Sequence, residues 1–355
     1  MLKHKILHIG LVIITVLSLL SACSTHKNTA TTRWWKAFNT RYNVYYNGKM
    51  AYIDGSLEKE KSHKDNFTEL LPLYSVSSKA SRETGKGSFE RAIVKSKKAI
   101  RLYSINKKPD FTKERKKTER EKEWLSRKEY NPFLWKAWLL MGRSQFYKGS
   151  FDEAASTFSY MIRLYKTQPS IAQRAKAWLA KCYIEQGWLY DAEEIISEMK
   201  RDSVHWRAQK EWNYTLTDYY IRAKNYDLAA IYLRKVIKTE MRRLQKAREW
   251  YLLGQLYESL NQKENAFNAY KQVIKLNPPY HVEFNARIAM SEVMAQNKAS
   301  AMIRKLKKLT LSDKNKNYKD RIFYALGNVY LTQKDTLNAI NAYEKGRKES
   351  VNGGI

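Results

Sequence analysis

Apolar residues recur at spacings of three and four in two consecutive stretches of residues 131–164, with polar residues between them. The first stretch contains Trp138 and Gly142, the second contains Ala154 and Phe158, and a short Gly-Ser turn separates the two. This spacing is typical of amphipathic helices, and two such helices joined by a short turn form a helical hairpin. The small residues Gly142 and Ala154 would allow the two antiparallel backbones to approach closely.

The hairpin pattern repeats along the rest of the chain. The same step from Gly to Ala occurs again from Gly254 to Ala266 and from Gly327 to Ala339. With two weaker copies included, the key alanines are Ala154, Ala192, Ala229, Ala266 and Ala339. Their steps are nearly equal except for the last, which is twice as long and predicts one further, degenerate repeat near Ala301. A fixed period is typical of solenoids, so the sequence predicts an all-α, tetratricopeptide-repeat (TPR-like) helical-hairpin solenoid with about six repeats over residues 131–355.

Residues 33–130 predict an N-terminal helical cap followed by a degenerate repeat and a basic segment. Residues 33–54 contain seven aromatic residues at largely helical spacing: Trp34, Trp35, Phe38, Tyr42, Tyr45, Tyr46 and Tyr52. We expect this helix to pack on the array as its cap; the alternative is that its aromatic side chains lie at a membrane interface. After a loop, Phe89, Ala92, Ala99 and Leu102 have the spacing of a second repeat helix.

Residues 107–128 interrupt the repeats with ten basic and five acidic residues and few apolar ones. This composition indicates either a solvated loop or helix, or a segment that docks electrostatically on an anionic partner.

The N-terminus has the pattern of a lipoprotein signal peptide over residues 1–22. Two lysines precede an apolar run over residues 6–20 that is shorter than the approximately 20 residues of a membrane span. The sequence Leu20-Ser21-Ala22-Cys23 is similar to a bacterial lipobox, which predicts acylation of Cys23; an ordinary signal peptide with an incidental cysteine is the alternative. Residues 23–32 would form a polar tether. Since the tether directly after Cys23 contains no acidic residue, we expect the protein to be anchored in the outer membrane and to face the periplasm.

The formal net charge is +31, which by itself favours nucleic acid as a partner. An exported protein would meet no nucleic acid, and removal of the signal peptide would still leave +29. The expected anionic partners are therefore lipid head groups, cell-wall polymers, lipopolysaccharide and acidic proteins. With Cys23 acylated, Cys182 would have no disulfide partner, and its apolar neighbours predict a buried thiol.

No pattern of catalytic residues is recognisable. Outside the predicted signal peptide, which holds two of the six histidines, no pair has metal-ligand spacing, and the HExxH, GxSxG and Gly-rich phosphate-loop motifs are missing from the sequence. We therefore predict that the protein is not an enzyme and uses no cofactor, metal or small-molecule substrate.

The first helix of each hairpin in a solenoid lines a concave groove, and its outward positions can be mapped from the key Gly and Ala residues. This mapping predicts ten binding residues: Lys136, Arg143, Phe146, Arg174, Lys181, Tyr214, Arg248, Tyr251, Arg321 and Tyr324. Arginine pairs with carboxylates bidentately and tyrosine offers rigid contact area, so the groove would suit acidic or extended peptides. The alternative is that a chain of this charge exposes Lys and Arg on every face.

Four segments closely resemble the PorW/SprE lipoproteins of the type IX secretion and gliding-motility machinery: the lipobox at Cys23, residues 33–48, residues 66–72 and residues 129–159. The resemblance implies a non-enzymatic periplasmic TPR scaffold, anchored in the outer membrane, that links the outer-membrane translocon to periplasmic ring and motor components through protein–protein binding. It implies one functional residue, the acylated Cys23. Relatives continue beyond Ile355, so a truncated C-terminus is expected.

Two other functions are compatible with the same sequence. One is an outer-membrane protein assembly lipoprotein of the same architecture, which co-purification with a β-barrel insertase would favour. The other is the superhelical part of a cell-wall glycan enzyme whose catalytic domain is missing, which a lysozyme-like domain beyond Ile355 would favour.

Overall fold

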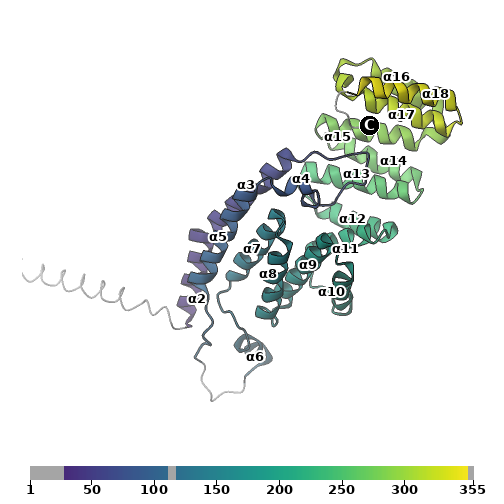
Figure 1. Ribbon diagram of the computed structural model, residues 1–355. Helices are drawn as coiled ribbons and strands as arrows, with labels where there is room; N and C mark the ends of the chain where they lie inside the picture. The colour runs from purple at the N-terminus through teal and green to yellow at the C-terminus, as the bar shows by residue number, and fades with distance from the viewer. Residues whose placement is uncertain (1–27, 111–116, 351–355) are drawn as a thin grey trace, which may run out of the picture. The chain divides into compact units, whose positions relative to one another are not determined.

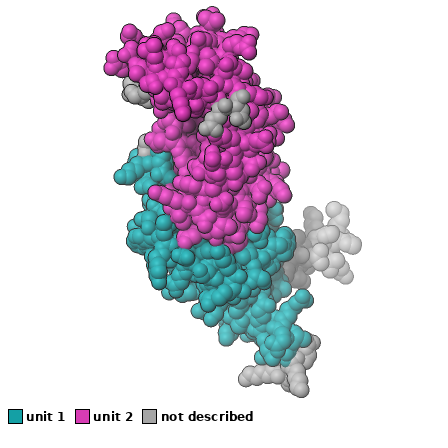
Figure 2. Space-filling model, turned by 90° about the vertical axis from the view of Figure 1, so that its right-hand side faces the viewer, with its two compact units in different colours: residues 1–63, 75–209 teal, residues 64–74, 210–355 magenta. Residues whose placement is uncertain are grey.

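The computed structural model describes residues 28–110 and 117–350. Within these two ranges the chain forms helices and no strand (Figure 1), and the predicted all-α, TPR-like helical-hairpin solenoid is confirmed. The chain divides into two compact units, coloured separately in Figure 2: residues 1–63 with 75–209 (unit 1), and residues 64–74 with 210–355 (unit 2). The predicted signal peptide and Cys23 lie outside the described residues.

Unit 1 contains the N-terminal helices and the first two hairpins of the expected array, so its limits differ from the boundary expected at residue 130. Its elements are α2 (Ala30–Asn39), the π-helix η1 (Thr40–Tyr45), α3 (Tyr46–Ser62), the 3₁₀ turn η2 (Ser75–Ser77), α4 (Lys79–Arg82), α5 (Lys86–Tyr103), α6 (Glu119–Leu125), α7 (Leu134–Lys148), α8 (Phe151–Leu164), α9 (Pro169–Gln186), α10 (Leu189–Arg201) and the 3₁₀ turn η3 (Trp206–Ala208).

Unit 2 contains the later hairpins together with the short segment 64–74. Its elements are α11 (Gln209–Arg222), α12 (Tyr226–Thr239), α13 (Arg243–Ser259), α14 (Lys263–Lys275), α15 (Tyr280–Val293), α16 (Ala295–Thr310), the 3₁₀ helix η4 (Asp313–Tyr318), α17 (Lys319–Thr332) and α18 (Thr336–Glu349). Helices α15 and α16 form the degenerate repeat that the doubled spacing near Ala301 predicts.

The hairpins close through contacts between a glycine on the first helix and an aromatic ring on the second. A Cβ atom on Gly142 would lie only 2.5 Å from Cζ of Phe158, so no larger residue fits beneath this ring. A Cβ atom on Gly254 would likewise collide with the Tyr270 ring, and one on Gly327 would collide with the Tyr343 ring. The Gly-to-Ala pattern therefore reflects how the two helices of each hairpin pack. The alanines of the same hairpins are fully buried.

The helix expected over residues 33–54 is present as α2, η1 and α3, which form a single helical rod. One face packs on the rest of unit 1: Val44 belongs to a cluster with Ala99, Leu134 and Ala137, and the ring of Tyr45 meets that of Phe133 edge-on at 5.1 Å. The other face is exposed. The expected cap is thus formed by one side of the rod alone, and five of its seven aromatic side chains do not take part in it.

Two other predictions about the N-terminal region change in detail. The polar tether expected up to residue 32 ends earlier, because the side chain of Thr29 accepts a hydrogen bond from the Thr32 N–H and caps α2. In the basic segment 107–128, Thr118 and Glu121 form a capping box that starts the exposed helix α6. Cys182 is buried, as expected, and its burial raises the pKa of the thiol well above the usual range.

Candidate functional site

Three side chains at successive turns of α13 form the best-defined binding surface in unit 2. Arg248, Tyr251 and Gln255 are spaced by three and four residues, so they lie on one face of the helix. We refer to these three residues as the α13 face. Arg248 and Tyr251 were both predicted to line the groove, whereas Gln255 was not.

The α13 face is occupied by the chain's own segment 64–74, which has no helix and lies far earlier in the sequence. The guanidinium of Arg248 pairs bidentately with the carboxylate of Asp65, at 2.5 Å from Nε and 2.7 Å from Nη2. The same guanidinium donates to the backbone carbonyl of Pro72 at 3.2 Å. Only 11% of the Arg248 side chain and 8% of that of Asp65 are exposed, so this ion pair is largely shielded from water.

Gln255 binds the backbone of the segment rather than its side chains. Its Nε2 donates to the carbonyl of Glu69 at 2.6 Å, and its Oε1 accepts from the N–H of Leu71 at 2.9 Å. One side-chain amide thereby provides both a hydrogen-bond donor and a hydrogen-bond acceptor, as the backbone of a neighbouring β-strand would. Such contacts are independent of the side chains of the bound segment.

Tyr251 provides the apolar part of the site. Its ring meets the buried ring of Phe67 edge-on at 4.8 Å, and its hydroxyl donates to the Phe67 carbonyl at 3.4 Å. The ring of His281 on α15 also lies edge-on to Phe67, at 6.3 Å between ring centres. An edge-to-face pair of this kind adds about 1 kcal/mol beyond the buried area. The α13 face therefore contacts a carboxylate, an aromatic ring and two backbone groups of segment 64–74.

A turn within the segment brings these groups together. The side-chain oxygen of Asn66 accepts hydrogen bonds from the N–H and the hydroxyl of Thr68, at 3.1 and 2.7 Å. This Asx turn reverses the chain so that Asp65 and Pro72 both reach Arg248.

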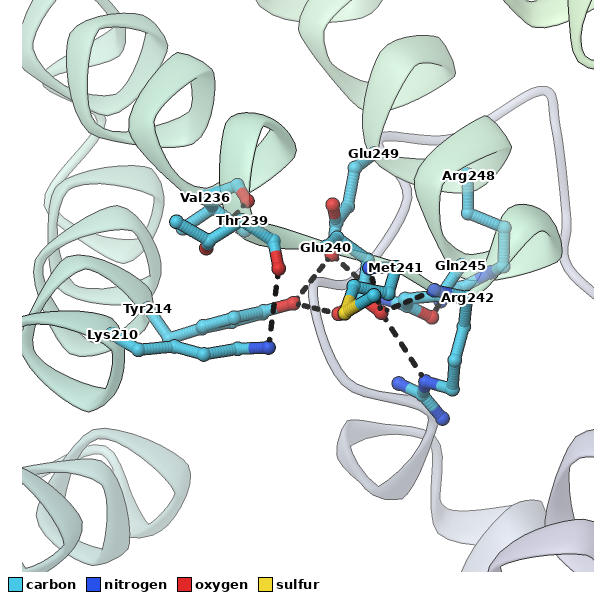
Figure 3. Close-up of polar contacts among 10 residues, drawn as sticks. All are labelled: Lys210, Tyr214, Val236, Thr239, Glu240, Met241, Arg242, Gln245, Arg248 and Glu249. Carbon is cyan, nitrogen blue, oxygen red and sulfur yellow. Dashed lines mark hydrogen bonds and ion pairs between the residues drawn. The ribbon is translucent and has the colours of Figure 1, made fainter.

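Beside the α13 face, Tyr214 of α11 links two carboxylates (Figure 3). Its hydroxyl lies 2.6 Å from Oε2 of Glu240 and 2.8 Å from Oε1 of Glu249. A single phenol proton cannot serve two ionised carboxylates, so one of them must be protonated for both contacts to be favourable. The ring of Tyr214 also stacks on Tyr74 at 6.1 Å, which places this network at the end of segment 64–74.

The environments of the two carboxylates assign the proton to Glu249. Burial raises the pKa of Glu249 to about 7, and the neighbouring Glu240 acts in the same direction. Burial would also raise the pKa of Glu240, but hydrogen bonds from Tyr214 and the Arg242 N–H, with the Arg242 charge, hold it below its usual value. Gln245 donates to Glu249 at 3.2 Å and accepts from Arg248 at 3.2 Å, so the carboxylate pair is connected to the α13 face.

The other predicted residues of unit 2 differ in accessibility. Tyr214 is buried and acts through its hydroxyl, as described above. Arg321 on α17 donates to the side-chain oxygen of Asn285 at 2.9 Å. Tyr324, one helical turn on, is 43% exposed and contacts the ring of Tyr343 at 5.5 Å. Of these three residues, Tyr324 alone offers an exposed ring.

Three of the predicted groove residues in unit 1 are covered by packing. Phe146 and Lys181 are buried, with exposed fractions of 0% and 2%, so the expectation that they line an open groove is corrected. Phe146 packs on Trp178, and Lys181 Nζ lies 4.0 Å from the centre of the same ring. Arg143 donates to the Tyr52 hydroxyl at 2.9 Å, because α3 and α5 pack over this part of α7.

Lys136 and Arg174 remain half-buried at the surface of unit 1. Lys136 Nζ lies 4.7 Å from the centre of the Phe133 ring, and the Arg174 guanidinium lies 5.4 Å from that of Trp135. Burial lowers the pKa of Lys136, and the positive charges of Arg41, Arg174 and Lys49 lower it further. These four basic residues therefore form one patch.

Sequence reasoning missed Gln255 and the segment that it binds. The spacing of Gln255 from Arg248 and Tyr251 could have indicated the glutamine. Residues 66–72 were noted only for their family resemblance, since an irregular segment has no periodicity that points to a partner.

Comparison with protein families agrees with the repeat architecture. The tetratricopeptide repeat family matches residues 247–280 and 320–346, which are α13 with α14 and α17 with α18. Among solved structures, the chain is similar to BtubC (BKLC) from P. vanneervenii, with a TM-score of 0.38 and 13% identity over 74% of this chain and 89% of that one. No curated protein matches the sequence. The chain is thus an all-α protein with TPR repeats, the architecture of protein–protein interaction scaffolds.

Among the helices of the described ranges, none combines the length and apolar character that crossing a bilayer requires.

Proposed function

We propose that the protein is a non-enzymatic scaffold whose α13 face binds a peptide containing a carboxylate and an aromatic side chain. The observation that supports this most directly is the way in which Arg248, Tyr251 and Gln255 bind segment 64–74. That segment shows which chemistry the surface accepts: a bidentate ion pair, an edge-to-face ring contact and two backbone hydrogen bonds.

Segment 64–74 acts in this proposal as an internal ligand that a partner must displace. A tethered ligand has an effective concentration on the order of 1 mM. If the free segment bound with a Kd of about 10 µM, the site would be about 99% closed and a competing peptide would bind about 100-fold more weakly than to an open site. A partner sequence would therefore need several such contacts to compete.

The setting that we propose is the periplasmic side of the outer membrane, within the type IX secretion and gliding machinery. The support is in the sequence: the lipobox ending at Cys23 and the PorW/SprE-like segments 33–48, 66–72 and 129–159. The partners would be components of the outer-membrane translocon and of the periplasmic ring and motor complex. Acylated Cys23 would anchor one end of the chain while the repeats bind these proteins.

Binding of a labelled peptide with the sequence of residues 64–74 to the full chain tests the groove. Asp65→Asn with Phe67→Ala in the chain weakens the internal ligand, so the peptide should bind this chain at least tenfold more tightly than the wild type. Adding Arg248→Met should abolish this gain. The matched control is Glu69→Gln, since the Glu69 side chain is exposed and only its carbonyl contacts the site. Failure of the opened chain to bind the peptide would refute the proposal.

Crosslinking in the native envelope, followed by identification of the crosslinked proteins, tests the setting. Secretion-machinery components should be recovered with wild-type protein, and Cys23→Ala should leave unprocessed or mislocalised protein with a loss of secretion. Recovery of a β-barrel insertase in their place, or a mature and functional Cys23→Ala protein, would contradict this part of the proposal.

A further inference from the structure

Unit 1 exposes a row of large aromatic side chains on α2, η1 and α3. Trp34, Trp35, Phe38, Tyr42 and Tyr46, which we call the aromatic ladder, have exposed fractions of 62, 51, 43, 51 and 56%. The rings of the first four pack on one another, with centres 5.6 Å apart for Trp34 and Phe38 and 4.8 Å apart for Phe38 and Tyr42. A contiguous apolar surface of this kind is unusual on a monomeric protein and indicates an interaction site.

The opposite face of the same rod is fixed to unit 1, so the ladder has a defined orientation. Thr40, Val44 and Ala51 are buried, and a Cβ on Gly48 would lie 3.1 Å from that of Lys95 on α5. Polar contacts add to this packing. Asn131 Nδ2 donates to the hydroxyl of Thr40 at 3.0 Å, and Lys36 Nζ donates to the carbonyl of Ser104 at 2.9 Å. The aromatic residues therefore cannot turn inward to a core.

The π-helix η1 keeps the ladder straight. Trp34, Phe38, Tyr42 and Tyr46 follow one another at steps of four residues, and in an α-helix each such step overshoots a full turn by about 40°. In a π-helix the bonds join residues five apart, as from the Tyr46 N–H to the Arg41 carbonyl, and one turn takes more than four residues. The steps through residues 40–45 therefore rotate back, and the drift accumulated in α2 is partly cancelled.

Positive charge flanks the ladder, and negative charge is absent from the rod over residues 28–53. Arg41 and Lys49 are exposed on the rod itself. The Arg41 guanidinium lies 5.0 Å from the centre of the Tyr42 ring, so this charge belongs to the surface of the ladder. Tryptophan and tyrosine beside basic residues are the combination that lies at the boundary between lipid head groups and acyl chains.

We propose that unit 1 docks on a phospholipid surface through the aromatic ladder, with Arg41 and Lys49 facing the phosphate groups. Cys23 precedes Trp34 by eleven residues, which span at most about 40 Å when extended, so a lipid-anchored chain could bring the ladder to the bilayer. The inference depends on the proposed acylation of Cys23 only for bringing the ladder close to the bilayer. Docking would fix how unit 1 is oriented on the membrane, which a lipid anchor at Cys23 alone would not do.

Quenching of tryptophan fluorescence by brominated lipids tests the proposal with the full chain in phosphatidylcholine vesicles, with and without phosphatidylglycerol. Trp34 and Trp35 should be quenched, and the quenched signal should disappear in the Trp34→Phe, Trp35→Phe variant, which keeps the ladder apolar. Phe38→Ser with Tyr42→Ser keeps both reporters; each change should weaken docking about tenfold, since each removes apolar area whose burial in the membrane is worth more than about 1 kcal/mol of transfer.

Variants that each remove one positive charge distinguish binding to lipid head groups from burial of the apolar side chains. Arg41→Gln and Lys49→Gln should each weaken docking about fivefold on vesicles with phosphatidylglycerol and leave neutral vesicles unaffected. Circular dichroism confirms that each variant is folded.

Two outcomes would overturn the assignment. One is membrane-bound wild-type protein with Trp34 and Trp35 unquenched. The other is a photo-crosslinker at position 38 that labels a protein and no lipid in the native envelope. Mass spectrometry of Cys23 is a separate readout: quenched Trp34 and Trp35 without an acyl group would support docking and contradict the proposed anchor.

Discussion

The ion pair between Asp65 and Arg248 makes the strongest prediction about how segment 64–74 is retained. Asp65→Asn removes the charge of the carboxylate and keeps its size. Both partners are about nine-tenths shielded, and loss of one member of a buried pair costs about 3 to 5 kcal/mol. Because about a tenth of each side chain remains exposed, we take the lower end of this range, about 3 kcal/mol.

Hydrogen exchange at the Leu71 amide measures this loss directly, because this N–H donates to Gln255 and is released when the segment leaves the α13 face. A change of about 3 kcal/mol in the local opening free energy corresponds to exchange about 150-fold faster. Glu69→Gln removes one charge from the same segment and should change the opening free energy by less than about 0.5 kcal/mol.

A double-mutant cycle with Arg248→Met then isolates the pair. Each single substitution should leave the other charge buried, so the double variant should be less destabilised than the sum of the two, with a coupling of about 2 kcal/mol. Unchanged Leu71 exchange in Asp65→Asn, or strictly additive effects in the cycle, would refute the reasoning.

Three further predictions concern packing and buried charge. Gly142→Ala should destabilise unit 1 by about 1 to 3 kcal/mol, because the added methyl would meet the Phe158 ring at 2.5 Å. Gly87→Ala, where the methyl meets nothing within 4 Å, should stabilise by about 0.5 to 1 kcal/mol; equal denaturation midpoints for the two variants would contradict this account. The folded-state pKa of Glu249 is raised to about 7. Its contribution to the free energy of unfolding is therefore fully present below the usual pKa of 4.5 and is lost as the pH rises through 7. Unit 2 should thus lose about 3 kcal/mol over this range, and urea titrations of Glu249→Gln should show a flatter profile. Lys59 behaves oppositely in unit 1: burial lowers its pKa to about 8, so the unfolded chain binds more protons between pH 8 and 10.5. Stability should rise by up to about 3 kcal/mol across that window in the wild type, and a Lys59→Met protein with the same rise would exclude this explanation.

The repeat fold could be predicted from the sequence because its packing is local. Gly142 and Phe158 are close in the sequence, so the contact that closes the hairpin lies within one period of the pattern. The same local rule recurs at Gly254 and Gly327. A periodic sequence therefore specifies each hairpin before any long-range contact is known.

The binding residues were harder to predict because accessibility depends on what packs over the helices from elsewhere. Arg143, Phe146 and Lys181 have the correct helical positions for a groove. In unit 1, however, the N-terminal helices and Trp178 cover these side chains. Position within a repeat indicates which way a side chain points, and it does not indicate whether another part of the chain lies there.

Segment 64–74, which occupies the α13 face, was hard to predict for the same reason. Asp65 and Phe67 are an acidic and an aromatic residue in an irregular stretch, and nothing local distinguishes them from other loop residues. Their role depends on Arg248 and Tyr251, which belong to a distant part of the sequence.

The aromatic rod at residues 33–54 shows where helical spacing stops being informative. Seven aromatic residues at such spacing fit a buried cap and a membrane interface equally well, because both need an apolar stripe. Two features decide how the stripe is divided. Small and β-branched residues such as Val44 and Gly48 allow close packing on one side, and the π-turn at residues 40–45 keeps Phe38, Tyr42 and Tyr46 together on the other. The buried face then accounts for the fold, and the exposed face is the surface that we propose docks on lipid.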